Sequence, residues 1–278
     1  MVCVDLDRTL IYSPSALLLD VPDHAAPRLL CVEVYRGAPL SFMTETAAAA
    51  LVELARVAVL VPTTTRTPEQ LARVNLPGPH APFAIASNGG HLLAGGVEDA
   101  AWTSRVRAAV AGCAPADEVD TYVRSSGAAP PTGFLRSVRV ASGLFVYAVV
   151  ERANVPAGWL AALSAWCAER GWVTSLQGRK VYCVPAPLTK SAAALEVVRR
   201  TGAYRWLAAG DSLLDAELLV AADEAVRPAH GELAESRFTS GHLHVTVARG
   251  VLAGEELTAW LLARVGAPES VGASASLR

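Results

Sequence analysis

Aromatic and charged residues are both scarce in this chain of 278 residues, at 6% and 18% of the sequence. With so few aromatic side chains, any platform for stacking nucleic-acid bases would be small. The charges also nearly cancel, because 24 Lys and Arg stand against 26 Asp and Glu. A surface that binds nucleic acid needs a basic excess, so we expect no nucleic-acid partner.

Cysteines are few as well, and none of them forms a C-x-x-C pair. Their odd number and scattered positions predict free thiols in a reducing compartment, buried as small hydrophobes. No apolar run is long enough to cross a membrane, and no basic segment followed by an apolar one opens the chain. We therefore expect a cytoplasmic protein without a membrane partner. The cysteines are Cys3, Cys31, Cys113, Cys167 and Cys183.

Apolar residues make up 52% of the chain, which is ample for a buried core. The length fits one domain with a large insertion, or two compact domains. Both ends of the chain alternate short apolar strands with helices, which predicts an α/β fold with a parallel sheet. In these parts we expect a hairpin over 29–35 and 38–42, later strands over 57–61, 83–86, 91–93, 206–209 and 244–247, and helices over 43–56, from Pro68, from Thr189 to Arg200, after Asp215 and over 254–264.

The middle of the chain has a different rhythm, which predicts a compact α+β unit with the order αββαββ inserted into the first domain. The resulting boundaries are 1–94 and 186–265 for the core and 95–185 for the insertion. The small, polar tail 266–278 is predicted to be disordered. The inserted elements are a helix over 99–113, a Pro- and Gly-rich stretch around 127–133, a hairpin over 135–140 and 144–150, a helix over 156–170 and a hairpin over 172–176 and 180–184.

The first strand ends in two carboxylates, Asp5 and Asp7. Because residues of a strand alternate faces, both should point the same way at the carboxyl edge, where open α/β sheets bind ligands. Two carboxylates held so close resist ionising together unless a cation or a shared proton intervenes. The pair therefore indicates a site for a hard metal such as Mg²⁺, or a nucleophile beside an acid. A plain strand end followed by a turn is the alternative.

Polar residues also follow other predicted elements: Thr64 follows a strand, Lys190 begins a helix, and Asp211 and Asp215 follow another strand. The carboxyl ends of parallel strands share one edge, so these groups can converge with Asp5. Their chemistry is that of phosphoryl transfer, which depends on positioning and charge stabilisation. A Mg²⁺ ion would screen the repulsion between phosphate and an attacking carboxylate. The attack would form an acyl phosphate that water then hydrolyses.

Four short motifs stand in order along the chain. They are D-x-D-x-[TV] as Asp5-Leu6-Asp7-Arg8-Thr9, an apolar strand ending in Thr or Ser as 57–64, a lone Lys as Lys190, and G-D-x-x-x-D as Gly210 to Asp215. In this order they resemble the haloacid dehalogenase (HAD) superfamily of phosphohydrolases over nearly the whole chain. The αββαββ insertion, preceded by Ser87-Asn88-Gly89-Gly90, resembles the type IIB cap. That cap occurs in Cof-type sugar phosphatases, sucrose-phosphate phosphatase, mannosyl-3-phosphoglycerate phosphatase and phosphomannomutase.

This resemblance implies a Rossmann-like core with a type IIB cap, and a Mg²⁺-dependent phosphatase acting on a small phosphorylated metabolite such as a sugar phosphate. It makes Asp5 the nucleophile and Asp7 the general acid/base, with the Asp7 backbone carbonyl on Mg²⁺. It places Asp211 in the metal shell and Asp215 at or just behind it. The hydroxyl of Thr64 and the ammonium of Lys190 would then hold the phosphoryl oxygens.

Two residues depart from the family pattern. Arg8 replaces the commoner Gly after the second Asp, which adds a bulky cation near the phosphate entrance. Thr65 replaces the Gly of the second motif, which leaves three consecutive threonines. The register favours Thr64 as the second-motif hydroxyl because it lies two residues before Arg66, and Thr63 is the alternative.

Candidate contacts for the rest of the substrate are Arg8, Arg66, Asn88, Arg179 and Lys180. The last two are attractive because the hairpin turn beside them could face the core, although a solvated charge pair is the plainer interpretation. The motifs leave the substrate and the oligomeric state open.

Three other functions compete with a phosphatase. A phosphomutase on the same scaffold would return the phosphate to another hydroxyl, and a catalytically silent protein would use the cap as an interaction surface. Residues 210–213 also spell the G-D-S-L signature of a serine esterase family. That family carries the block near its amino terminus and pairs it with a D-x-x-H histidine, which neither His242 nor His244 matches.

Overall fold

The core of the protein is a parallel β-sheet. In the computed structural model, which describes residues 1–128 and 133–266, five strands lie in the order β14-β13-β12-β1-β4. Strand β1 (Val2–Val4) lies between β12 (Leu207–Ala209) and β4 (Leu60–Pro62), and β13 (Glu224–Arg227) and β14 (Leu243–Val245) extend the sheet beyond β12. All of these pairings are parallel, which confirms the predicted α/β class.

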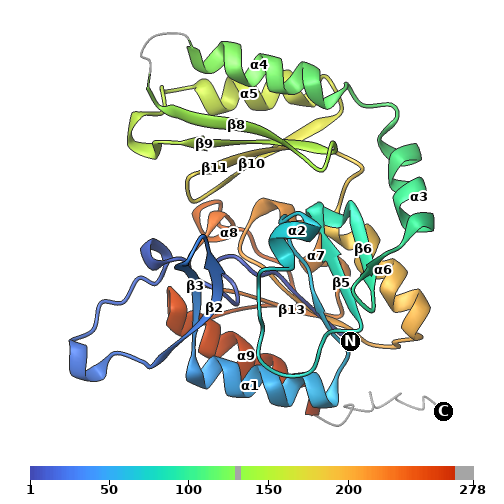
Figure 1. Ribbon diagram of the computed structural model, residues 1–278. Helices are drawn as coiled ribbons and strands as arrows, with labels where there is room; N and C mark the ends of the chain where they lie inside the picture. The colour runs from blue at the N-terminus through green and yellow to red at the C-terminus, as the bar shows by residue number, and fades with distance from the viewer. Residues whose placement is uncertain (129–132, 267–278) are drawn as a thin grey trace, which may run out of the picture.

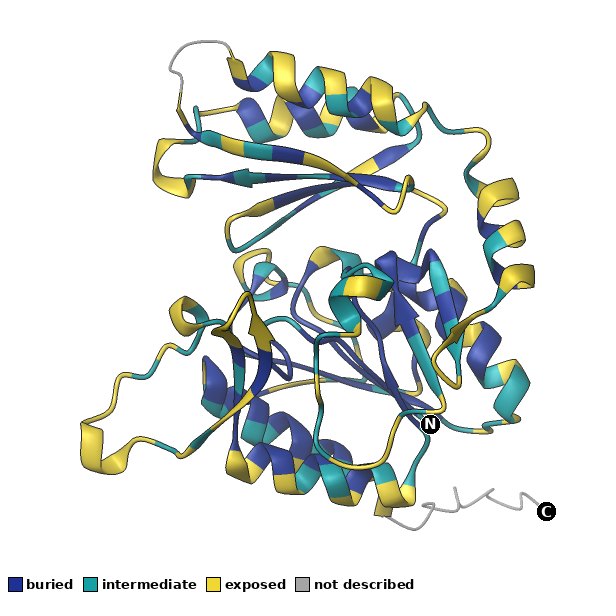
Figure 2. Ribbon diagram, viewed as in Figure 1, coloured by how far each residue is buried: buried dark blue, intermediate teal, exposed yellow. Residues whose placement is uncertain are grey.

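Helices cover both faces of this sheet (Figure 1). They are α1 (Glu45–Val57), α6 (Lys190–Thr201), α7 (Ala216–Ala221) and α9 (Val251–Gly266). Val2 and Val4 of β1 pack in the cluster that contains α1 and α9, whereas Cys3 packs in the cluster that contains α6 and α7. This alternation is the period of a strand buried on both faces. Figure 2 shows the same pattern, with buried strands between helices whose outer faces are exposed.

Smaller elements surround the parallel sheet. Thr63 bridges Ile85 in parallel, so the edge of the sheet continues from β4 toward β5. The hairpin of β2 and β3 contacts α1 and α9. The elements are β2 (Leu29–Tyr35), β3 (Ala38–Thr44), β5 (Phe83–Ala86), β6 (His91–Ala94), β7 (Val97–Glu98), α2 (Pro68–Leu71) and α8 (Glu232–Glu235), with 3-10 turns at η1 (Pro14–Ala16), η2 (Asp23–Ala25), η3 (Ser87–Gly89) and η5 (Leu213–Asp215).

The inserted unit is a four-stranded antiparallel sheet in the order β10-β11-β9-β8. Two helices cover the face turned away from the core, and the other face is turned toward the carboxyl edge of the parallel sheet (Figure 1). This arrangement confirms the predicted α+β cap. Its elements are α4 (Ala116–Ala128), β8 (Leu135–Ala141), β9 (Phe145–Val150), η4 (Arg152–Asn154), α5 (Trp159–Ala168), β10 (Trp172–Gln177) and β11 (Lys180–Pro185).

The first helix of the αββαββ order is α4, and not the helix predicted over 99–113. That earlier segment forms α3 (Ala100–Val110), which packs on the core, where Trp102 Nε1 donates to the Gly89 carbonyl at 2.8 Å. In α4 the residues spaced four apart toward the cap sheet are Val119, Val123 and Gly127. A Cβ at Gly127 would lie 2.4 Å from Leu135 Cδ2, so this glycine permits close packing where the sequence indicates a turn.

Three further expectations need correction. Strand β13 was not predicted, because charged residues at both ends leave only Ala225 and Val226 as an apolar signal. All five cysteines are free, but Cys31 is exposed on the β2–β3 hairpin, and so is not buried as expected. Gly266, the first residue of the predicted tail, is the last residue of α9, and 267–278 lie outside the described residues. Among the described helices, none has the length and apolar character needed to span a membrane.

Candidate active site

Three neighbouring strands of the core end at one level, and each delivers a predicted site residue. The Asp5 N–H donates to the Ala209 carbonyl at 2.9 Å, and the Thr63 N–H donates to the Val4 carbonyl at 2.8 Å. These ladder bonds place Asp5 after β1 beside Thr64 after β4 and Asp211 after β12. The convergence expected at the carboxyl edge of a parallel sheet is therefore present.

Lys190 is the first residue of α6, and its ammonium joins two of the acids. Thr189 is the N-cap of that helix and accepts from the Ala192 N–H at 3.2 Å, which fixes where the helix starts. Lys190 Nζ lies 2.6 Å from Asp5 Oδ1 and 2.5 Å from Asp215 Oδ1, and the side chain is 1% exposed. The Thr9 hydroxyl donates to the second oxygen of Asp5, Oδ2, at 3.2 Å.

The loop after β12 holds Asp211 and Asp215 through very close packing. The backbone N–H and the hydroxyl of Ser212 both donate to Asp215 Oδ2, at 3.0 and 2.7 Å. A Cβ at Gly210 would lie 2.4 Å from the Cβ of Asp215. A Cβ at Gly231, whose φ is +92°, would lie 2.5 Å from Asp211 Oδ2. Both positions therefore require glycine if the two carboxylates are to keep their places.

The acids of this cluster carry more negative charge than the side chains beside them neutralise. Burial raises the pKa of Asp5 to about 7; Lys190 opposes that rise, and Asp215 and Asp7 add to it. Burial also raises the pKa of Asp211 well above its usual range, and the carboxylates of Asp5 and Asp215 raise it further. Burial alone would lower the pKa of Lys190, but Asp215 and Asp5 outweigh it and raise the pKa.

The same cluster fits a divalent cation. Asp5, Asp211 and Asp215 are buried, and each offers a carboxylate oxygen within 4.8 Å of the others. Carboxylate oxygens are the ligands that hard cations such as Mg²⁺ prefer. Since the raised pKa values reflect buried acids that lack full charge compensation, a cation would supply what the cluster lacks. The residues present therefore match a metal site.

Asp7 lies outside that cluster and is paired instead with Arg66. Arg66 Nε and Nη2 donate to the two oxygens of Asp7 at 2.7 and 2.8 Å. Arg66 Nη1 also donates to Glu33 Oε2 at 2.8 Å, and the Glu33 side chain is fully buried. Ser41 and Arg73 complete the partners of Glu33. Burial would raise the pKa of Asp7, but the hydrogen bonds and charge of Arg66 dominate and lower it.

The side-chain hydroxyls of Thr63 and Thr64 make different hydrogen bonds. The Thr63 hydroxyl donates to the Val61 carbonyl at 3.0 Å, so its hydrogen is used inside the core. The Thr64 hydroxyl accepts from the Arg66 N–H at 3.1 Å and keeps its own hydrogen for another acceptor. Both side chains are buried. This geometry favours Thr64 as the hydroxyl that can donate to a ligand.

Arg8 stands at the entrance with a backbone conformation that suits glycine. Its φ is +65°, in the left-handed region. Its Nε lies 3.3 Å from Asp211 Oδ2, so a guanidinium sits beside the acidic cluster. His230 Nδ1 accepts from the Gly250 N–H, which leaves Nε2 to donate to the Arg8 carbonyl at 2.8 Å. Burial lowers the pKa of His230 to about 4, so this histidine is neutral.

The remaining residues predicted to contact the substrate lie in different parts of the molecule. Asn88 is buried, and its Nδ2 donates to the Leu188 carbonyl at 2.7 Å, which ties η3 to the loop before Lys190. Arg179 and Lys180 lie at the β10–β11 turn. Lys180 Nζ is 5.7 Å from the centre of the Tyr147 ring. Its pKa is raised, first by Tyr182 and also by the Asp7 carboxylate. The turn beside it meets the core, since a Cβ on Gly178 would lie 3.5 Å from Arg8 Nη1.

Several solved structures share this architecture across nearly their whole length. A HAD subclass IIB sugar phosphatase is 11% identical, with 95% of this chain and 98% of that chain covered and a TM-score of 0.56. The HAD subclass IIB fold is the fold of this chain. For the sucrose-phosphatase of Synechocystis sp. PCC6803 the identity is 12%, the coverage 94% and 96%, and the TM-score 0.57. A trehalose-6-phosphate phosphatase related protein is 16% identical, with coverage of 95% and 98% and a TM-score of 0.54.

No protein-family model and no curated protein matches the chain. The solved structures confirm the predicted resemblance at the level of the fold. Because one fold hosts many functions, the activity of this HAD-fold protein has to be argued from its own side chains.

Three residues of the HAD-fold core that bear on the site escaped the sequence analysis. They are Glu33, which holds Arg66, His230, which holds the Arg8 carbonyl, and Glu232, which bonds the cap. Glu33 had one signal, since it is a single charge inside the apolar strand Leu29–Tyr35. His230 lies in the connection after β13 and Glu232 begins α8, and both meet their partners only in the folded chain.

Proposed function

We propose that the protein is a Mg²⁺-dependent phosphatase that hydrolyses a small phosphorylated metabolite, in particular a sugar phosphate. The proposal rests on one observation above all: the Asp5 carboxylate lies 2.6 Å from Lys190 inside a buried cluster of three acids at the carboxyl edge of the sheet. The proposed core comprises residues 1–94 and 186–265. The range 95–185 proposed for the cap also contains β7 and α3, which pack on the core, so the cap sheet and its two helices lie within 116–185. The HAD phosphatases that share the fold act on sugar phosphates by name, which supports the same substrate class here.

The reaction proceeds in two steps on Asp5. A carboxylate oxygen of Asp5 forms a bond to phosphorus while the ester bond between phosphorus and the leaving oxygen breaks, which gives an aspartyl phosphate. Water then attacks that phosphorus, the bond to Asp5 breaks, and inorganic phosphate leaves. Lys190 and Thr64 hold the phosphoryl oxygens, since one offers an ammonium and the other a hydroxyl hydrogen.

Asp7 handles the proton in both steps. It donates a proton to the leaving alkoxide in the first step and takes one from the attacking water in the second. The two hydrogen bonds from Arg66 favour the carboxylate form, which is the form that the second step uses. Asp5, Asp211, Asp215 and the Asp7 backbone carbonyl would hold Mg²⁺. The ion, when bound, supplies positive charge that screens the phosphate from the attacking carboxylate.

The cap recognises the leaving group, which is the part of the substrate from which phosphate is removed. Lys180 faces the core beside the Tyr147 ring, and Arg179 precedes it at the exposed turn. On the core side, the guanidinium of Arg8 is partly exposed and adds positive charge that favours an anionic substrate, whereas the Arg66 side chain is only 10% exposed and acts through Asp7, which it holds. Asn88 contributes by fixing the loop that precedes Lys190.

Hydrolysis of an aryl phosphate with Mg²⁺ is the direct test of this proposal. We expect purified protein to release inorganic phosphate from 4-nitrophenyl phosphate, and EDTA to lower the rate by about 100-fold or more, because the acidic cluster then lacks its cation. Added Mg²⁺ in excess of the EDTA should restore the rate, which serves as the control. A panel of hexose and disaccharide phosphates then ranks the leaving groups.

Phosphate release that is insensitive to EDTA would contradict the metal assignment. Transfer of phosphate to a second hydroxyl of the sugar, without release, would favour the phosphomutase instead. A protein that neither releases nor transfers phosphate would be the silent alternative.

The choice between two neighbouring hydroxyls is tested by a matched pair of substitutions. Thr64→Val should lower kcat by about 10- to 100-fold, because one donor to the phosphoryl group is lost without a change of shape. Thr63→Val should leave kcat within about threefold and cost roughly 1 kcal/mol of unfolding free energy, because it removes a hydrogen bond of the core. Steady-state kinetics and urea unfolding measure both quantities, and the reverse ranking of kcat would move the role to Thr63.

A further inference from the structure

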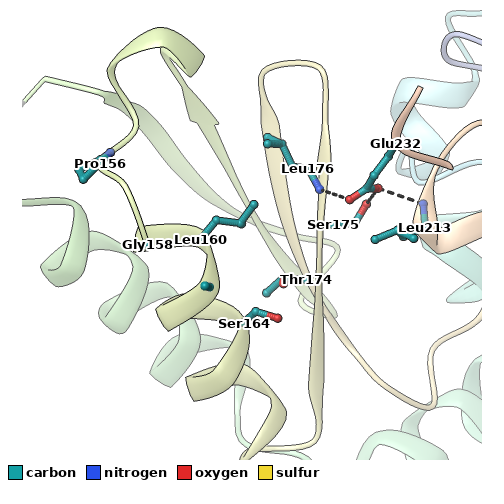
Figure 3. A pocket seen from close by; sticks show the side chains of 10 residues that line it. Pro156, Gly158, Leu160, Ser164, Thr174, Ser175, Leu176, Leu213 and Glu232 are labelled. Atoms are coloured by element: carbon teal, nitrogen blue, oxygen red, sulfur yellow. Dashed lines mark hydrogen bonds between the residues drawn. The ribbon is translucent and has the colours of Figure 1, made fainter. Parts of the chain in front are cut away.

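Two acidic residues of the short core helix α8, Glu232 and Glu235, contact the cap. Glu235 Oε2 lies 2.7 Å from Arg152 Nη2, and both side chains are about half exposed. Glu232 bonds the edge strand β10 instead, and its carboxylate is placed between cap and core (Figure 3). The two acids therefore share a helix and a charge but differ in the contacts they make.

The Glu232 carboxylate accepts hydrogen bonds from both sides at once. Its Oε1 accepts from the Leu176 N–H at 2.8 Å. Its Oε2 accepts from the Ser175 hydroxyl at 2.5 Å and from the Leu213 N–H at 2.9 Å. Hydrogen bonds to a carboxylate are stronger than those between neutral groups. We call this arrangement of Glu232, Ser175, Leu176 and Leu213 the clasp.

The core side of the clasp is built into the loop of the acidic cluster. Leu213 lies midway between Asp211 and Asp215, and the Leu233 N–H donates to the Asp211 carbonyl at 3.0 Å. Gly231, immediately before Glu232, touches Asp211 with no room for a side chain. The Glu232 carboxylate is therefore fixed relative to the acids of the site.

The cap side of the clasp lies just before the turn that faces the site. β10 is the edge strand of its sheet, so the Leu176 N–H bonds Glu232 and not another strand. The strand ends at Gln177, whose amide donates to Ser175 Oγ at 3.3 Å, and the turn then leads to Lys180. A Cβ on Gly178 in that turn would lie 3.5 Å from Arg8 Nη1.

Hydrophobic packing does not close the gap beside the clasp. A cavity of about 480 Å³ opens between α5, β10 and η5, with Leu160, Thr174 and Leu213 in its wall and Glu232 at its edge (Figure 3). Because the apolar surfaces leave space here, cap and core are joined beside this cavity by the hydrogen bonds of the Glu232 carboxylate and by the exposed ion pair between Glu235 and Arg152.

We propose that Glu232 is a positioning residue, which fixes the β10–β11 hairpin over the site so that Lys180 meets the leaving group of the substrate. This inference rests on the proposed phosphatase function for its kinetic part only. Its structural part, that the clasp holds β10 to the core, stands on the hydrogen bonds. Substrates that do not reach the cap should be insensitive to Glu232.

Hydrogen exchange of the Leu176 amide tests the clasp without any activity. In Glu232→Ala we expect this amide to exchange about tenfold faster than in the wild type, because its acceptor on the core is removed. Ser175→Ala, which keeps the charge of Glu232, should give a smaller increase. Glu235→Ala is the matched control and should leave the exchange rate unchanged, since an exposed ion pair contributes little. Equal exchange in Glu232→Ala and the wild type would overturn the clasp.

Steady-state kinetics test the positioning role. For the sugar phosphate with the highest kcat/KM in the panel, Glu232→Ala should raise KM about tenfold and change kcat by less than about threefold. For 4-nitrophenyl phosphate its KM should stay within about twofold. In a Lys180→Ala background, the same substitution should add less than about twofold to KM, because the side chain being positioned is already absent.

The possible results of these experiments distinguish a failure of the positioning role from a failure of the proposed phosphatase function. Faster exchange with an unchanged KM for the sugar phosphate would overturn the positioning role, as would an additive effect in the Lys180→Ala background. Wild-type protein that hydrolyses no phosphate ester, while Glu232→Ala still accelerates exchange, would refute the proposed function and support the clasp.

Discussion

Replacing Asp5 by Asn is expected to abolish phosphate release, by about 10⁴-fold or more, because the substitution removes the atom that attacks phosphorus. The change is nearly isosteric. The neutral amide would also resemble the neutral acid that burial already favours, since the pKa of Asp5 is raised to about 7. The fold should therefore survive, and Lys190 keeps its bond to Asp215. The rate of release from 4-nitrophenyl phosphate, measured beside the circular dichroism spectrum, gives the result.

An Asp-to-Asn substitution at an exposed position is the control for differences that arise during expression and purification. Asp20 is exposed and lies in the long connection before β2, so Asp20→Asn should keep the full rate. Hydrolysis that persists in folded Asp5→Asn would exclude an aspartyl phosphate on this residue. In that case Asp7, whose side chain is 40% exposed, would have to act in the attack itself.

The parts of the site that sequence could predict are those set by local structure. Asp5 directly follows a short apolar strand, Asp211 follows another strand after one glycine, and Lys190 follows the helix cap Thr189, so each position depends on its own neighbours. Once the strands are known to be parallel, their carboxyl ends must share an edge. The two hairpins of the cap and the helix between them likewise depended on signals within short windows.

What sequence could not predict depends on contacts between distant segments. The pairing of Asp7 with Arg66 joins residues far apart in the chain, and Glu33 from a third segment orients the arginine. The helix α4 was missed because Gly127 serves a tertiary contact with Leu135, whereas local rules assign such a glycine to a turn. In both cases the deciding partner is supplied by the fold, so no window of sequence contains it.

Replacing Lys190 by Met is expected to cost about 3–5 kcal/mol of unfolding free energy in the absence of Mg²⁺. The ammonium is buried between Asp5 and Asp215, and its loss leaves those two acids without the cation that pairs with them. For a chain of this length, the loss corresponds to a fall in Tm of roughly 10 °C. Arg56→Met, at an exposed ion pair with Glu53, is the control and should cost less than about 0.5 kcal/mol.

Mg²⁺ should restore part of the stability that Lys190→Met loses. It should raise the Tm of this variant more than it raises the Tm of the wild type. A ligand that binds only the folded state stabilises it by about 2.7 kcal/mol at 100 times its Kd. Removing Lys190 removes a cation that competes for Asp5 and Asp215, so Mg²⁺ should bind the variant more tightly and the difference in Tm should shrink as Mg²⁺ is added. Activity should stay low, because the ammonium that holds the phosphoryl group is still missing. A Tm difference that is independent of Mg²⁺ would place the ion away from these carboxylates, and thus separate the metal site from the acidic cluster.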